Sequence, residues 1–197
     1  MKKVILTAVF LLMALTVRLD AQSNIFGFQY SVAYTVGDMN NFIERPSFRG
    51  LEFDYHHFLG EKFAVGFEFL WNNFYEEKTY DTYTDGTASI SGKQYRYCLV
   101  MPMLVSARYY FKPGETICPF AGFGLGTAWS RNDVDMGLYR FNDNAWHFTI
   151  KPEAGIIYNP NSNFGVSFSV KYFESFKSGN IGDRSYVATN LGMAWTW

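Results

Sequence analysis

The stretch Ile25-Phe-Gly-Phe-Gln-Tyr-Ser-Val-Ala-Tyr-Thr-Val36 alternates large apolar side chains with small or polar ones without a break from Phe26 onward. Successive side chains of a β-strand point to opposite faces, so this period of two predicts a strand. Phe28 and Tyr30 fall on its apolar face, whereas Gln29 falls on the other. From Phe26 onward the large apolar side chains are all on one face, so the strand predicts one bulky apolar surface and one narrow surface of small or polar side chains.

Seven further segments show the same alternation along the rest of the chain. The eight predicted strands are residues 25–36, 48–58, 63–74, 95–111, 117–130, 145–158, 164–176 and 186–197. Short connections (59–62, 112–116, 159–163) alternate with long ones (37–47, 75–93, 131–144, 177–185). This pattern predicts an all-β fold, an eight-stranded antiparallel up-and-down transmembrane β-barrel. Pro102 lacks a backbone donor, so we expect a bulge there.

The polarity of the two faces distinguishes this fold from a soluble lipocalin-like ligand carrier, which has the same number of strands. Aromatic residues make up 20% of the chain, yet its mean hydropathy is only −0.10. In a lipocalin the apolar face points inward, whereas here Gly, Ala and Ser accompany the charged face, as a narrow lumen requires. Aromatic residues near the long connections suggest a membrane girdle: Tyr34, Trp71, Tyr97, Trp129, Trp146 and Tyr172.

The first residues have the pattern of a secretory leader. Lys2 and Lys3 precede an apolar run that ends near Arg18, and Ala21 is a small residue before a polar segment. This predicts a signal peptide over residues 1–21 and a barrel domain over residues 22–197, with a retained N-terminal anchor as the alternative. With an even number of strands, both termini should lie on the periplasmic, short-turn side.

Removal of residues 1–21 takes away three of the 17 basic and one of the 18 acidic side chains, which leaves a net charge near −3. A weakly acidic chain without a basic cluster argues against nucleic acid as a partner.

Eight charged residues fall on the inward parity. They are Glu52, Asp54, Glu68, Arg96, Arg108, Lys151, Glu153 and Lys171. The second and third strands of an eight-stranded barrel face the sixth and seventh, so an acidic wall should meet a lysine wall. Buried charges are tolerated when they are paired, so we expect ion pairs that fill the lumen. A gated or proton-conducting path is the alternative.

The C-terminal stretch Asn190-Leu-Gly-Met-Ala-Trp-Thr-Trp197 resembles the signal that the barrel-assembly machinery recognises in outer-membrane proteins. The matching residues are Asn190, Gly192, Trp195 and Trp197. The glycine-alternating segment 119–128 is similar to a strand of small OmpA- and OmpX-like barrels. The resemblance implies the bacterial outer membrane, contact with its lipid and lipopolysaccharide, and assembly by that machinery, but no activity.

The longest connection, residues 75–93, contains Asp85-Gly86 between β-prone runs, which is a strong hairpin signal. We expect a protruding ribbon that could bind an extracellular partner by strand addition. OmpX-like barrels have a similar projection, which suggests adhesion. A solvated extension without a partner is the alternative.

The remaining reactive side chains predict no catalytic site, metal or cofactor. Asp133, Asp135, Asn142, Asp143 and Asn144 lack a calcium-binding spacing, and none of His56, His57 and His147 accompanies a nucleophile. Cys98 and Cys118 should lie about 40 Å apart and stay free. The sequence therefore favours an integral outer-membrane protein with a structural or surface-interaction role and no enzymatic activity. A narrow small-solute channel is the runner-up.

Overall fold

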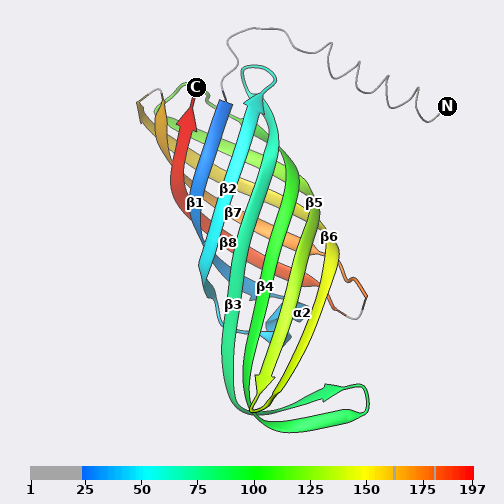
Figure 1. The fold of residues 1–197 in the computed structure, drawn as a ribbon. Coiled ribbons are helices and arrows are strands. Elements are labelled where there is room, and N and C mark those ends of the chain that lie inside the picture. Colours follow the sequence, from blue (N-terminus) through cyan, green and yellow to red (C-terminus); the bar gives the residue numbers. More distant parts are fainter. Residues whose placement is uncertain (1–23, 162, 180) are drawn as a thin grey trace, which may run out of the picture.

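The protein is a closed barrel of eight antiparallel strands (Figure 1), as predicted. The computed structural model describes residues 24–161, 163–179 and 181–197, so the predicted signal peptide at 1–21 lies outside the described residues. The strands are β1 (Asn24–Val36), β2 (Ser47–Phe58), β3 (Phe63–Asp85), β4 (Ala88–Tyr110), β5 (Ile117–Met136), β6 (Tyr139–Asn161), β7 (Phe164–Ser175) and β8 (Arg184–Thr196). One short helix, α2 (Asp38–Phe42), follows β1.

Each strand pairs with its sequence neighbours, and β1 closes the ring against β8, with Phe26 opposite Trp195. The predicted faces are confirmed along β1, where Gln29 is buried and Tyr30 and Tyr34 are 46% and 49% exposed. The apolar face therefore points outward. Among the described residues, no helix is long and apolar enough to cross a membrane.

Strands β3 to β6 are longer than their alternation predicted, and they run past the other four (Figure 1). The prediction of a long loop at 131–144 is wrong, because β5 and β6 remain paired over these residues and are joined by a tight turn that contains Gly137. The ribbon predicted at 75–93 is present. Beyond a register shift between Lys78 and Asp81, its tip turns away from the barrel (Figure 1).

The bulge predicted at Pro102 is not formed. Phe69 pairs with Met103 and Asn72 with Val100, so the β3–β4 register is the same on both sides of the proline. The missing backbone donor is accommodated by a gap in the β3 ladder, while Ala128 of β5 remains opposite Pro102. The strand therefore passes the proline without an inserted residue.

The first long connection folds back over the barrel mouth through α2. Met39 and Ile43 are fully buried, and the Thr35 hydroxyl donates to the carbonyl oxygen of Ile43 at 2.7 Å. Met39 and Ile43 belong to an apolar cluster at the long-loop end of the barrel, which is drawn at the bottom of Figure 1 and is here called the upper layer. Its members are Ala33, Met39, Ile43, Leu70, Phe74, Cys98, Val100, Leu104, Ala128, Phe173, Tyr186 and Ala188, and Phe42 packs against them.

A second apolar cluster lies at the short-turn end of the barrel, which is drawn at the top of Figure 1, and is here called the lower layer. Its members are Ile25, Ala64, Tyr110, Cys118, Phe120, Ile157 and Ala194, with Phe58 packed against them. The buried charged residues Glu52, Asp54, Glu68, Arg108, Lys151, Glu153 and Lys171 lie between the two layers.

Candidate functional site

The carboxylate of Glu68, on β3, is the centre of an ionic cluster inside the barrel. Arg108 Nη2 lies 3.0 Å from its Oε1, and Lys151 Nζ lies 2.5 Å from its Oε2. Lys171 Nζ reaches the same Oε2 at 3.3 Å. Three cations from β4, β6 and β7 therefore meet one carboxylate, and the contacts cross the lumen.

Arg108 links both walls of the cluster. Its Nη1 lies 2.8 Å from Asp54 on β2, and its Nε lies 2.8 Å from Glu153 on β6. Its guanidinium also lies over the ring of Phe120, 4.9 Å from the centroid, which connects the cluster to the lower layer. A planar group with five donors can satisfy several carboxylates at once, which an ammonium group does less well.

Lys171 completes the contact between the walls by pairing with Glu52 on β2 and with Glu153, 3.0 Å away. The structure thus brings together Glu52, Asp54, Glu68, Arg108, Lys151, Glu153 and Lys171 in one ionic cluster. All seven side chains are buried.

Arg96 lies apart from this cluster although it also points inward. Its Nη2 contacts Asp81 at 2.7 Å, and its Nη1 donates to the carbonyl oxygen of Phe42 at 3.2 Å. Arg96 therefore joins α2 to the base of the projecting ribbon, above the upper layer.

Several other polar side chains that contact the cluster were not assigned to it from the sequence. His56 contacts Asp54 through Nδ1 at 3.2 Å and Ser106 through Nε2 at 2.8 Å. Gln29 donates to Asp54 at 2.8 Å, and Asn190 donates to Glu52. Inward parity was the available signal, since His56 follows Glu52 and Asp54 at a spacing of two.

The cluster leaves little room for solvent between the two apolar layers. The side chains of Glu52, Glu68, Lys151 and Lys171 have 0% exposure. A side chain that solvent cannot touch does not line an open aqueous path. The lumen is filled in three successive layers, apolar, ionic and apolar, which is what an eight-stranded barrel has room for.

The four residues of the predicted assembly signal lie on β8 or directly after it. Asn190 is buried and points inward, whereas Trp195 faces outward between Phe26 and Phe164, with ring centroids 6.1 and 5.9 Å away. Trp197 is 60% exposed. A Cβ on Gly192 would overlap the backbone of Phe28 and Gln29 on β1, so this position has no room for a side chain.

The other candidates from the sequence occupy separate places. His147 contacts Ser130 at 2.7 Å, and His57 contacts Asn24 at 2.8 Å. Cys98 lies in the upper layer and Cys118 in the lower layer, and both are free. Within the described part of the chain, no group of three or more His, Cys, Asp or Glu side chains could hold a metal ion.

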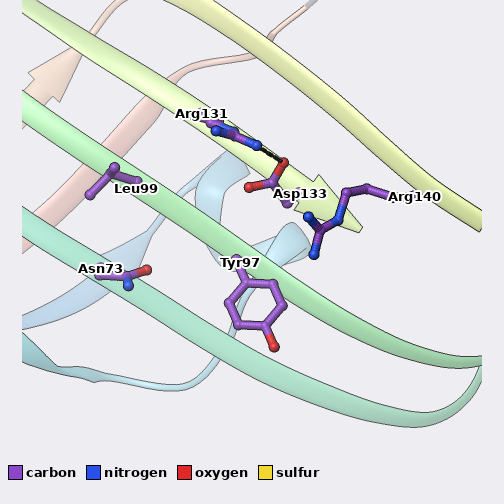
Figure 2. Close-up of a pocket in the computed structure, with 6 residues that line it drawn as sticks. All are labelled: Asn73, Tyr97, Leu99, Arg131, Asp133 and Arg140. Atoms are coloured by element: carbon purple, nitrogen blue, oxygen red, sulfur yellow. Dashed lines mark hydrogen bonds and ion pairs between the residues drawn. The ribbon is translucent and has the colours of Figure 1, made fainter. Parts of the chain in front are cut away.

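The outer surface of β3 to β6 carries a hollow of about 240 Å³ near the long-loop end (Figure 2). The residues that line it are Asn73, Tyr97, Leu99, Arg131, Asp133 and Arg140. Arg131 Nη2 lies 3.0 Å from Asp133, and Arg140 pairs with Asp135, with Nε 2.5 Å from Oδ1. The acidic residues 133 and 135 are therefore engaged by arginines.

Comparisons with known proteins agree with this architecture. The family model described as "Outer membrane protein beta-barrel domain" matches residues 6–196. No curated protein matches the sequence.

Three solved structures illustrate the likeness in fold. Neisserial surface protein A is 12% identical with a TM-score of 0.57, over 89% of this chain and 97% of that one. OprG of Pseudomonas aeruginosa is 13% identical with a TM-score of 0.54, over 89% and 95%. Ail, the attachment invasion locus protein of Yersinia pestis, is 12% identical with a TM-score of 0.53, over 89% and 97%.

Proposed function

Because this chain belongs to the outer membrane protein β-barrel domain family, we propose that it acts at the bacterial surface through its projecting strands and not through its lumen. The three-layered filling of the lumen is the observation that carries the proposal. The barrel then serves as a rigid anchor for the extracellular part.

The ionic cluster supports a structural use of the interior. Opening a path would require breaking the contacts of Arg108 with Asp54, Glu68 and Glu153, which would leave buried charges without partners. Leaving a buried charge without its partner costs about 3–5 kcal/mol. The cluster would therefore stay closed under ordinary conditions, and the interior offers no site for catalysis.

The projecting ribbon supports a surface-interaction role. Its backbone is paired up to the turn, with Thr84 opposite Ser89, and Tyr80 is 76% exposed. A paired, outward-reaching ribbon presents strand edges and aromatic side chains to an extracellular partner, which can add a strand to it. The name of Ail indicates attachment, and its likeness to this chain is one of fold.

The proposal is tested by replacing residues 79–91 with a two-residue Asn-Gly turn. Cells that display the full chain should adhere to at least one surface in a panel of immobilised matrix proteins and sulfated polysaccharides, and the shortened chain should lose that adhesion. In a planar bilayer the purified full chain should give no discrete current steps. Regular steps would favour the narrow solute channel instead.

The same proposal includes a route to the membrane. The leader would be removed after Ala21, the assembly machinery would bind the segment 190–197, and both termini would lie in the periplasm. The mature chain should begin at Gln22, and an epitope tag before it should become accessible to antibody only after the outer membrane is permeabilised. Labelling of the tag in intact cells would contradict this orientation and place the N-terminus outside the cell.

A further inference from the structure

One row of inward positions crosses four neighbouring strands beside the ionic cluster. Asn190 of β8 lies opposite Ser31 of β1, and Ser31 lies opposite Gly50 of β2. Gly50 in turn lies opposite Asn72 of β3. These four strands run side by side in Figure 1. Glu52 is the next inward position of β2 towards the short turns, so the row borders the ionic cluster at this carboxylate.

The polar side chains of the row carry atoms whose hydrogen bonds are not made. Ser31 Oγ, both amide atoms of Asn72 and Oδ1 of Asn190 have no hydrogen-bond partner within the described part of the chain, and all three side chains are fully buried. The same holds for the hydroxyl of Tyr186, whose ring packs 5.7 Å from that of Phe74, the next inward residue after Asn72. Burying polar groups without hydrogen bonds is costly, so these atoms point to a bound ligand.

Gly50 lets the side chains of the row come together. A Cβ on Gly50 would lie 2.2 Å from Oδ1 of Asn72 and 2.8 Å from Cβ of Ser31. The side chains of the two flanking strands therefore lean over the glycine from both sides. Asn190 uses its Nδ2 to donate to Glu52, which leaves its Oδ1 for another partner.

The charge of the ionic cluster favours a cation at this place. Its four carboxylates and three permanent cations leave a surplus of one negative charge. Glu68 and Glu153 each contact three cations. Among the described residues, Glu52 forms an ion pair only with Lys171. Glu52 can therefore accept one more cation, on the side where the row begins.

We propose that the row binds one alkali-metal cation, held by the carboxylate of Glu52 and by the neutral oxygens of Ser31, Asn72, Tyr186 and Asn190. Hard cations prefer oxygen ligands of these kinds. A surplus of one negative charge matches a monovalent ion, whereas a divalent ion would reverse the sign of the cluster. The ion would be the fourth cation of the ionic cluster and would hold β8, β1, β2 and β3 together across the lumen.

The test is the dependence of stability on sodium. The full chain is refolded in lipid vesicles and unfolded with urea, while choline chloride replaces sodium chloride at constant ionic strength, so that screening does not change. Because one ion binds the folded chain, a rise from about 10 to about 100 mM sodium should lower the unfolding equilibrium constant about tenfold. Equal stability in sodium and in choline would overturn the proposal and mean that water satisfies these atoms.

Two substitutions in the row should shift the sodium dependence in opposite directions. Ser31→Ala removes one neutral ligand and should require at least about tenfold more sodium for the same stabilisation. Asn72→Asp adds a second carboxylate and should require at least about tenfold less, because ligand charge tunes cation affinity. A general loss of folding cannot produce opposite shifts, and heat-modifiable gel migration checks that each variant is folded.

Ser130→Ala is the matched control. Ser130 is also a fully buried serine, on β5, which lies opposite β1 in a ring of eight strands, and its hydroxyl contacts His147 at 2.7 Å. This substitution should lower stability equally in sodium and in choline and leave the sodium dependence unchanged. Loss of the sodium dependence in Ser130→Ala, or an unchanged dependence in both Ser31→Ala and Asn72→Asp, would overturn the proposal.

These outcomes are separable from a failure of the proposed surface role. The substitutions lie in the lumen and leave residues 79–91 intact, so adhesion should be the same in Ser31→Ala as in the wild-type chain.

Discussion

At the scale of single residues, the charged side chains of the lumen are stabilised by having several ion-pair partners each. Glu68 accepts contacts from Arg108, Lys151 and Lys171 and lies 3.5 Å from His56. The cluster contains four carboxylates and three permanent cations, and the ring of His56 contacts two of the carboxylates, Asp54 and Glu68. Each of these charges depends on the others, because an unpaired charge in a dry interior is costly.

Substitution of Glu68 by Gln should therefore be among the most damaging single changes in the lumen. It removes the shared partner of three cations while keeping the shape of the side chain. We expect a loss of about 3–5 kcal/mol in the free energy of unfolding, measured by urea titration of the refolded protein in lipid vesicles. Glu61→Gln, on an exposed short turn, is the control and should change stability by less than about 0.5 kcal/mol. Equal effects of the two would mean that the cluster is solvated.

A second residue-scale prediction concerns pH at the outer rim. Hydrogen bonds from Arg140 hold the pKa of Asp135 below its ordinary range. The stabilisation from this pair is complete above the pKa of an unfolded-chain aspartate, about 4, and is lost as the pH falls through the lower folded pKa. In Arg140→Gln, the carboxyl resonance of Asp135 should titrate at a higher pH than in the wild-type chain. An unchanged titration midpoint would mean that Arg140 does not contact Asp135 in solution.

At the scale of elements, the alternation of side chains predicted all eight membrane strands but not their lengths. Inside the membrane one face meets lipid and the other meets the lumen, so parity is strict. Beyond it, residues such as Asn142 and Asp143 meet water, and the signal disappears although Asp143 still pairs with Asn132. The short helix α2 has too few residues for a period to show.

The partners of Arg96 were not predicted from the sequence. Its inward parity was predicted, but its partner depends on where β3 and β4 leave the ring. In the structure it lies at the bend, between Asp81 and α2, with its Cζ 5.4 Å from the ring centroid of Phe42. Parity therefore predicted the face of Arg96 but not its partners.

Arg96 should therefore control the order of the ribbon. In Arg96→Gln, amide hydrogen exchange in residues 82–92 should be about fivefold faster, the effect of losing about 1 kcal/mol of local stability. The control is Lys93→Gln, which breaks an exposed pair with Glu77 of 2.7 Å and should have a smaller effect. A larger increase in exchange in the Lys93→Gln control would mean that contacts within the ribbon, and not Arg96, keep it ordered.

At the scale of the whole molecule, the barrel is closed by layers that different parts of the chain supply. The upper layer depends on α2, which covers the mouth, whereas the ionic cluster and the lower layer depend on the strands alone. Removal of one layer should therefore expose the interior only as far as the next. The two native cysteines report on this, because Cys98 lies in the upper layer and Cys118 in the lower one.

Replacement of residues 38–42 by a Gly-Ser linker of equal length should make Cys98 reactive towards a membrane-impermeant maleimide applied outside intact cells. Cys98 is fully buried in the wild-type chain and should be inert there. Cys118 should stay unlabelled from outside in both chains, because the contacts of Glu68 and Arg108 remain between the reagent and the lower layer. Cys98→Ser and Cys118→Ser variants of each chain assign the label to one thiol.

Labelling of Cys118 from outside once α2 is removed would show that the ionic cluster admits solutes and that α2 is the gate of a channel. Labelling of Cys98 alone would show that side chains of the strands close the barrel by themselves, because the ionic cluster would then exclude the reagent even without α2.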